Sequence, residues 1–204
     1  MDLPDPSSAA LAATARRRAG AALAGHRGDE ESARTFQHDP DPAVRATALA
    51  ALSRLGSLTP DDVQSALHDA DPDLRRRACE MSIGLVEVDL RSSLDDLDVY
   101  VAEAAAWAAG ERRDTALVGA LAAMAGGHRD PLCREAAIAA LGSIGDRAGL
   151  DAILAGLTDK PAVRRRAVLA LAPFEGPEVR AGLESARQDR DWQVRQAAED
   201  LLDP

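Results

Sequence analysis

The sequence predicts an all-α fold, an α-solenoid (α-α superhelix) of about six to seven short helical hairpins. Two observations on composition and one on pattern predict it. Apolar residues make up 46% of the chain but aromatic residues only 2%, so the core has to be built from Ala, Leu and Val. These residues favour closely packed helices over a β-sandwich. One pattern also recurs along the chain at nearly constant spacing, which is typical of a repeat array.

The recurring pattern is clearest in four segments that open on an Asp-Pro or Lys-Pro pair. They are DPAVRATALAALSRLG (41–56), DPDLRRRACEMSIGLV (71–86), DPLCREAAIAALGSIG (130–145) and KPAVRRRAVLALAPFE (160–175). Weaker copies cover 14–26, 98–113 and 191–204. Each copy has one apolar residue near its start that we call the marker. The markers are Ala15, Val44, Leu74, Val101, Cys133, Val163 and Val194. Successive markers are 29, 30, 27, 32, 30 and 31 residues apart.

Each marker is predicted to open a helix with a buried stripe. An alanine follows four residues later in every copy: Ala19, Ala48, Ala78, Ala105, Ala137, Ala167 and Ala198. Offsets 0, +4, +7, +8 and +11 fall within an arc of about 100° on a helix, so they form one face. Between the copies, apolar residues such as Val63 and Leu67 indicate a second, shorter helix, which Thr59 and Pro60 are suited to begin. Each unit is therefore a hairpin that has to stack on its neighbours.

The repeats are not interrupted by a linker or a change in composition. We therefore predict a single solenoid domain over residues 9–204, preceded by a flexible tail over residues 1–8. Neither a signal peptide nor a membrane span of about 18 apolar residues is recognisable, so we expect a cytoplasmic protein. Cys79 and Cys133 lie within apolar helical patterns two repeats apart, where we expect buried free thiols.

The repeat motif resembles a known family. It consists of an Asp-rich turn, an apolar-Arg pair, Ala at +4 and then Ala-Leu-x-x-Leu/Ile-Gly, and it is strongest at 39–56, 130–145 and 160–172. This motif resembles the HEAT-like repeats of the phycobilisome-lyase type, and the resemblance covers nearly the whole chain. It implies a HEAT-like solenoid whose marker helices line the concave surface. It implies no single function, because HEAT-like repeats occur in lyases, hydroxylases, DNA glycosylases and adaptors.

An arginine follows the marker in six of the seven copies. These residues are Arg16, Arg45, Arg75, Arg134, Arg164 and Arg195. Because they recur in register with aspartate-containing turns, we predict a structural ladder in which each guanidinium pairs with turn carboxylates and ties adjacent repeats together. A phosphate-binding track is the alternative. Ala102 replaces the arginine in the copy that begins at Val101, and we expect local irregularity there.

The exposed face of the marker helices is the predicted binding surface. Offsets +2, +3, +6 and +10 avoid the buried stripe, and the charges at these offsets alternate in sign along the array, which suits a protein or peptide better than a polyanion. The predicted partner-binding residues are Trp107, Arg76, Arg77, Glu80, Glu103, Glu111, Arg165 and Arg166.

Trp107 occupies offset +6, where the other copies carry Ala, Glu, Leu or Asp. An exposed tryptophan in a groove is a candidate hot spot for binding. The alternative is that the short interval of 27 residues before this copy shifts the helix, so that Trp107 fills a gap in the core. Trp192, directly before the last marker helix, is predicted to pack within the C-terminal hairpin.

Catalytic, cofactor and metal sites are not predicted. The sequence contains no Gly-x-Ser-x-Gly elbow, glycine-rich phosphate loop or metal-spaced cysteine pair. His38, His68 and His128 recur once per repeat, too far apart to converge on one metal ion. The His-Glu dipeptides that supply the di-iron ligands of the HEAT-repeat deoxyhypusine hydroxylases are also missing from the sequence.

Charge narrows the class of partner. A net charge of −10 argues against nucleic acid or an anionic membrane, since both need a cationic face. We therefore expect a non-catalytic protein–protein interaction scaffold that binds a protein or peptide on its concave face. A bilin lyase or chaperone-like subunit is an alternative implied by the repeat family. A HEAT-like DNA-base glycosylase is a second alternative, but it would need aromatic residues around an extruded base and a basic cleft.

Overall fold

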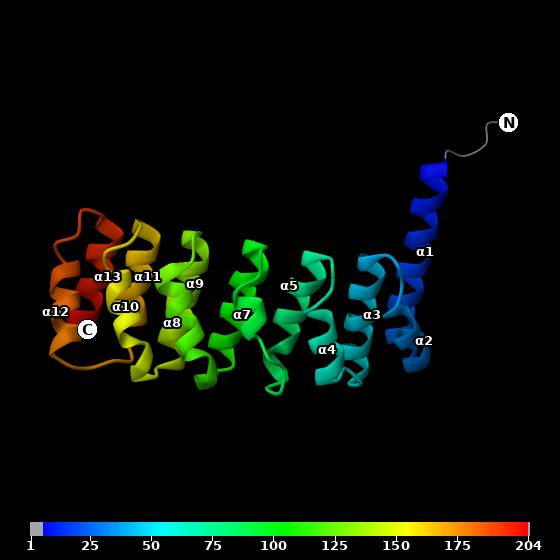
Figure 1. The fold of residues 1–204 in the computed structure, drawn as a ribbon, viewed down its shortest axis with the longest axis horizontal. Helices are drawn as coiled ribbons and strands as arrows, with labels where there is room; N and C mark the ends of the chain where they lie inside the picture. The colour runs from blue at the N-terminus through cyan, green and yellow to red at the C-terminus, as the bar shows by residue number, and fades with distance from the viewer. Residues whose placement is uncertain (1–5, 204) are drawn as a thin grey trace. The chain divides into compact units, whose positions relative to one another are not determined.

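The structure is a computed structural model that describes residues 6–203. Over these residues it contains thirteen α-helices, three short 3-10 helices and no strand (Figure 1), so the predicted all-α fold is confirmed. The chain divides into two compact units, Met1–Met81 (unit 1) and Ser82–Pro204 (unit 2). Residues 1–5 of the predicted tail lie outside the described residues, and the first helix begins at Pro6. The single solenoid over residues 9–204 stays a prediction.

The helices follow one another as hairpins in both units. Those of unit 1 are α1 (Pro6–Arg27), α2 (Glu30–Phe36), α3 (Pro42–Leu55), α4 (Pro60–Ala66) and α5 (Pro72–Met81). Those of unit 2 are α6 (Arg91–Leu94), α7 (Val99–Glu111), α8 (Val118–Gly127), α9 (Pro131–Ile144), α10 (Leu150–Gly156), α11 (Pro161–Ala170), α12 (Pro177–Ala186) and α13 (Trp192–Leu202). The 3-10 helices η1 (Ser82–Gly84), η2 (Thr115–Leu117) and η3 (Arg147–Gly149) also belong to unit 2.

The marker helices form one layer in each unit. In unit 1, α3 packs on α1 and α5. In unit 2, α9 packs between α7 and α11, and α11 also packs on α13. The helices α8, α10 and α12 form a second layer, in which each packs on the marker helix that follows it (Figure 1). One face of the marker layer is therefore covered by the second layer, and its opposite face is available for contacts.

The alanine four residues after the marker is buried in six copies. Ala48, Ala78, Ala105, Ala137, Ala167 and Ala198 are all fully inaccessible. In the first copy the prediction was wrong, because Ala19 is exposed and Ala21 and Ala24 are buried instead. The helix α1 is so rich in alanine around Arg16–Arg18 that several registers of the pattern fit its sequence equally well.

Capping aspartates set where the marker helices begin. Asp41, Asp98, Asp130 and Asp191 each accept a hydrogen bond from the backbone N–H two residues later, at 2.9 Å. A side-chain acceptor at this position satisfies one of the backbone donors that the first helical turn leaves free. The recurring aspartate of the turn thus has a local structural role, which accounts for part of the acidic composition.

Close approach of the marker helices depends on glycine at two crossings in unit 2. A Cβ atom added at Gly142 of α9 would lie 2.7 Å from the Cβ and 2.8 Å from the Cα of Ala170 in α11. A Cβ atom added at Gly110 of α7 would lie 2.9 Å from the Cα of Ala140 in α9. The atoms in contact belong to backbone and methyl groups that cannot rotate away.

We expect Gly142→Ala to destabilise the protein by about 1–3 kcal/mol, because the added methyl group overpacks the crossing of α9 and α11. Gly119→Ala in α8 is the matched control, since a Cβ atom there has open space around it. That control should stabilise the helix by roughly 0.5–1 kcal/mol. Urea denaturation measures the free energy of unfolding of both variants. If both substitutions destabilised the protein, or both stabilised it, the close approach of α9 and α11 would be contradicted.

Arginine–aspartate pairs connect successive repeats. Arg45 donates to both carboxylate oxygens of Asp69 at 2.9 and 2.6 Å. Arg134 makes the same bidentate contact with Asp159 at 2.6 and 2.7 Å. Arg164 repeats it with Asp189 at 2.7 Å for both bonds. This geometry matches the planar guanidinium to the carboxylate and is among the stronger polar contacts in proteins.

The ladder arginines also bond to the turn before their own helix. Arg45, Arg75, Arg134 and Arg195 donate to the carbonyl oxygen six residues earlier, at 2.8 or 2.9 Å. The assignment of Arg16 to the ladder was wrong in the structure, because Arg16 is exposed and Arg17 forms the ion pair with Asp39 at 2.7 Å. Arg17 takes the place of Arg16 because the buried face of α1 differs from the predicted one.

Stability should fall in acid because of these pairs. The hydrogen bond from Arg164 lowers the pKa of Asp189, and that from Arg134 lowers the pKa of Asp159. A carboxylate whose pKa is lower in the folded state stabilises the protein above its unfolded pKa of about 3.9, and this contribution is lost as the pH falls through the folded pKa. We expect the free energy of unfolding to fall below about pH 4. The double variant Asp159→Asn/Asp189→Asn should lose less stability over the same pH range, and an unchanged pH dependence would contradict the assignment.

The start of unit 2 is less regular than the other repeats. Between η1 and α7 the chain forms only one helix of four residues, α6. Val88, Leu90 and Leu94 in this segment are nevertheless fully buried or nearly so. Arg112 anchors it by donating to the carbonyl oxygens of Val86 and Val88 at 2.8 and 2.9 Å. The irregularity expected near Ala102 thus lies in the segment before α7.

Candidate functional site

The structure distributes the predicted partner-binding residues over both units. Arg76, Arg77 and Glu80 lie on α5 in unit 1, where both arginines pair with Glu80 at 2.7 and 2.9 Å. The other five residues lie in unit 2. Four of these line one pocket, namely Glu103, Trp107, Glu111 and Arg166, and Arg165 lines the next pocket. Because the charged side chains on α5 pair with one another, the stronger candidate for a binding site lies in unit 2.

Three adjoining pockets form a groove across the marker helices of unit 2. The first, of about 230 Å³, lies between α7 and α9. The second, of about 290 Å³, shares Glu135 and Arg166 with the first and extends over α11. The third, of about 190 Å³, shares Arg165 and Leu169 with the second and reaches α13. We call this continuous surface over α7, α9, α11 and α13 the unit-2 groove.

Helical spacing and small residues shape the groove. Glu103, Trp107 and Glu111 are four residues apart on α7 and therefore stand one turn above another on the same face. The floor of the first pocket is made of small residues: Gly110, Ala136, Ala139, Ala140 and Ser143. Because α7 and α9 approach closely at Gly110, the indole of Trp107 forms a wall directly beside this floor.

Exposed apolar side chains follow the whole groove. Trp107 is 45% exposed, so it is not the core residue that the alternative interpretation required. Leu132 and Leu169 are also exposed and line the first and the second pocket. The prediction for Trp192 was wrong, since this residue is 65% exposed and lines the third pocket. As the first residue of α13, it points outward while the marker Val194 is buried.

Charges in the groove are unequally distributed. Three carboxylates, of Glu103, Glu111 and Glu135, line the first pocket together with one guanidinium, of Arg166. Arg166 is paired with Glu135 at 3.3 Å across α9 and α11. Within residues 6–203, the carboxylates of Glu103 and Glu111 have no side-chain hydrogen bond or ion pair. The wall around Trp107 is therefore acidic.

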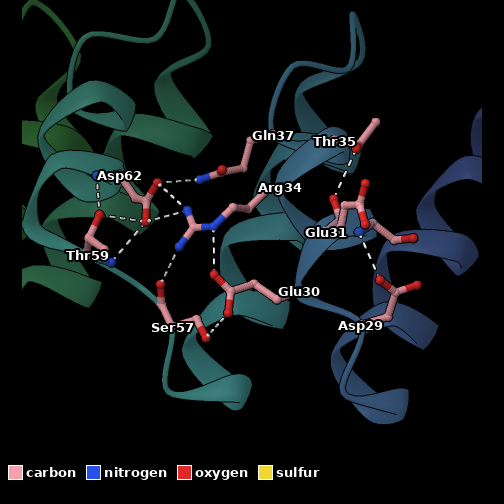
Figure 2. A network of polar contacts seen from close by, with 10 residues as sticks. Asp29, Glu30, Glu31, Arg34, Thr35, Gln37, Ser57, Thr59 and Asp62 are labelled. Atoms are coloured by element: carbon pink, nitrogen blue, oxygen red, sulfur yellow. Dashed lines mark hydrogen bonds and ion pairs between the residues drawn. The ribbon is translucent and has the colours of Figure 1, made fainter.

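A pocket in unit 1 is a rival site. It has a volume of about 390 Å³, lies between α2 and α4 and is lined by Arg34, Gln37, Arg45, Asp62 and Asp69, among others. Figure 2 shows three of these side chains, Arg34, Gln37 and Asp62, in a polar network with Arg34 at its centre. Arg34 donates to Asp62 at 3.3 Å, to Glu30 at 2.8 Å and to the carbonyl oxygen of Ser57 at 3.0 Å. This network fixes α2 to the turn before α4 and engages Arg34, Gln37 and Asp62 within the protein itself.

Within residues 6–203, the cysteines are buried and the acidic side chains do not gather as metal ligands. Cys79 and Cys133 are buried free thiols. Burial raises the pKa of the Cys133 thiol to about 11, which disfavours the reactive thiolate at neutral pH. Within residues 6–203, no group of three His, Cys, Asp or Glu side chains could hold a metal ion. None of the described helices combines the length and apolarity needed to cross a membrane.

Comparison with known proteins supports the repeat fold. Residues 88–162 match the family model described as HEAT repeats. The chain is similar to the complex of CpcE and CpcF of phycocyanin lyase from Nostoc sp. PCC7120, with 25% identity, a TM-score of 0.58 and coverage of 83% of this chain and 74% of that chain. No curated protein matches it.

Two engineered proteins have similar structures. The crystal structure of an engineered protein matches with 19% identity and a TM-score of 0.62, covering 85% of this chain and 95% of the other. A designed armadillo repeat protein in complex with the peptide (KR)4 matches with 15% identity and a TM-score of 0.58, covering 92% and 97%. Residues 88–162 thus carry HEAT repeats, and the chain has the helical-repeat fold that HEAT and armadillo proteins share.

Proposed function

We propose that the chain is a non-catalytic scaffold that binds an extended peptide segment of a partner protein along the unit-2 groove. The observation that carries this proposal is the run of exposed apolar side chains, Trp107, Leu132, Leu169 and Trp192, along adjoining pockets. Contiguous exposed apolar surface marks interaction sites in soluble proteins. Tryptophan is also the residue type most enriched among interface hot spots.

The dimensions of the groove suit an extended segment. Packed helices lie about 8–10 Å apart, so the three steps from α7 to α13 span roughly 24–30 Å. An extended chain advances about 3.3 Å per residue, so a segment of about eight residues covers this length. The designed armadillo protein that binds the peptide (KR)4 offers a structural precedent for peptide binding by this fold.

The residues that line the groove favour binding over catalysis. None of them is a His or a Cys, and the one hydroxyl group among them is that of Ser143. Aromatic, aliphatic and charged side chains of both signs are typical of a recognition surface, in which the apolar residues supply affinity and the charges supply selectivity.

A subunit of a bilin lyase is a second candidate, favoured by the similarity to the CpcE–CpcF complex. A linear tetrapyrrole carries propionate groups, which the carboxylates around Trp107 would repel. We therefore expect no change in the absorption spectrum of such a pigment when the protein is added. A saturable spectral change that requires Trp107 would instead support the lyase-subunit function.

Selection from a displayed library of random twelve-residue peptides tests the proposal. We expect enriched peptides to bind the unaltered protein and to lose affinity for Ala139→Gln, which places a larger side chain in the first pocket. Ala155→Gln is the matched control, because Ala155 is exposed on α10 in the other layer. Failure to enrich any peptide, or equal binding by both variants, would contradict binding in the groove.

Nucleic acid should not bind. The net charge of −10 and the carboxylates in the groove oppose the phosphate backbone. We expect no mobility shift of duplex or single-stranded DNA at micromolar protein and physiological salt. A salt-dependent shift that is weakened by Arg165→Ala/Arg166→Ala would contradict this expectation and would favour the glycosylase class.

A further inference from the structure

We propose that the first pocket of the unit-2 groove receives an arginine or lysine side chain of the bound segment, stacked on Trp107 between Glu103 and Glu111. This inference rests on the proposed function and specifies the chemistry of the partner. The juxtaposition that carries it is an exposed indole with a carboxylate one helical turn before it and another one turn after it.

The size of the pocket indicates a single side chain. Its volume of about 230 Å³ is below the range of roughly 300–1,000 Å³ that is typical of sites for drug-sized molecules. Its floor consists of glycine, alanine and serine, so it offers a long side chain an unobstructed surface beside the indole. A flat guanidinium or a lysine stem can lie along this surface and in contact with the ring.

The charges select a cation. Residues four apart on a helix have Cβ atoms about 5–6 Å apart, so the side chains of Glu103 and Glu111 are both close enough to contact a group stacked on the Trp107 ring. Neither carboxylate has an ion-pair partner in the part of the chain that the structure describes. A bound anion would be repelled, and an apolar side chain would remove water from the carboxylates without compensation. A cation gains contacts with both carboxylates and with the face of the indole.

The remaining charges in the pocket do not change this preference. Arg166 is the one cation that lines it, and its guanidinium is engaged by Glu135 at 3.3 Å. Arg165, for which residues 6–203 provide no ion-pair partner, lines the second and third pockets instead. The net charge of −10 also attracts basic segments over longer distances.

The test uses the displayed library of random twelve-residue peptides. We expect arginine or lysine to be enriched in the selected peptides, and replacement of an enriched arginine by citrulline, or of an enriched lysine by acetyl-lysine, to weaken binding at least tenfold. Citrulline keeps the shape of arginine and removes its charge. In the variant Glu103→Gln/Glu111→Gln, which keeps the contact with the indole, the same replacement should change the dissociation constant by no more than about fivefold.

A charge-matched control separates local from global electrostatics. Asp151→Asn/Glu184→Gln removes the same charge from α10 and α12, which line none of the three pockets. It should bind the selected peptides as the unaltered protein does, within about twofold.

The outcomes distinguish the two proposals. If no peptide is enriched, the proposed function itself fails. Another outcome is the enrichment of peptides whose binding is weakened by Ala139→Gln but which lack basic residues or bind equally well with citrulline or acetyl-lysine. In that case the scaffold function stands and the proposal of a cation pocket is overturned. An equal loss in the control variant would also overturn it. Replacing a residue of the peptide leaves the fold of the protein unchanged, so this arm does not depend on the stability of a variant.

Discussion

Arg164→Ala should destabilise the protein by about 3–5 kcal/mol, the largest effect that we expect from a single substitution. Arg164 is 5% exposed, and its guanidinium holds the Asp189 carboxylate with two bonds of 2.7 Å. Its third contact, with the carbonyl oxygen of Asp159 at 2.8 Å, would be lost as well. The Asp189 side chain is 13% exposed and would keep the bond from the backbone N–H of Asp191, but it would lose its ionic partner, and breaking such a largely buried pair accounts for the size of the effect. Urea denaturation followed by circular dichroism measures it.

Two further variants make this prediction specific. Arg165→Ala removes an exposed neighbouring arginine and should change stability by no more than about 0.5 kcal/mol. The double variant Arg164→Met/Asp189→Leu removes both charges and should recover most of the loss, because an apolar pair leaves no buried charge unpaired. A small effect of Arg164→Ala itself would show that the ladder contributes little to holding the repeats together.

Trp107→Ala should weaken the binding of selected peptides by about 2 kcal/mol or more, roughly thirtyfold in the dissociation constant. The indole is the largest apolar side chain that lines the first pocket and would stack on the bound cation. Its effect on folding should be small, within about 1 kcal/mol, because 45% of the residue is already exposed. Fluorescence anisotropy with a labelled peptide measures the binding.

Trp107→Phe serves as the control, since it retains an aromatic face and should keep most of the affinity. A loss of about 3–5 kcal/mol of folding stability in Trp107→Ala would identify Trp107 as a core residue instead. In that case the first pocket could not be assigned to binding.

The sequence predicts much of the fold because repetition makes each position observable several times. Alanine at +4 recurs at a spacing of 27–32 residues, and the six copies from Val44 onward are buried as expected. The first copy could not be aligned correctly because α1 presents small residues on nearly all faces. In such a helix only contacts with α3, which the sequence does not show, select the buried face.

The site was less predictable, because its features are not periodic. The outward position of Trp107 follows from its offset in the repeat, whereas the choice between exposure and core depended on packing. Trp192 lies at the first position of α13, where no periodic neighbour indicates which way it points. Arg112 does not recur in the other copies, and it donates to backbone carbonyl oxygens of an irregular segment. The sequence therefore does not indicate that its side chain is buried. The continuity of the groove depends on close helix crossings that only the structure shows.

The most direct test of the central claim is a titration observed at the tryptophan side chains by NMR. The chain contains two tryptophans, so ¹⁵N-labelled protein gives two indole N–H signals, which Trp192→Phe assigns. On addition of a selected basic peptide, we expect the Trp107 signal to shift and saturate with the dissociation constant measured by anisotropy. Binding with that dissociation constant while the Trp107 signal stays in place would contradict the claim that the unit-2 groove is the binding site.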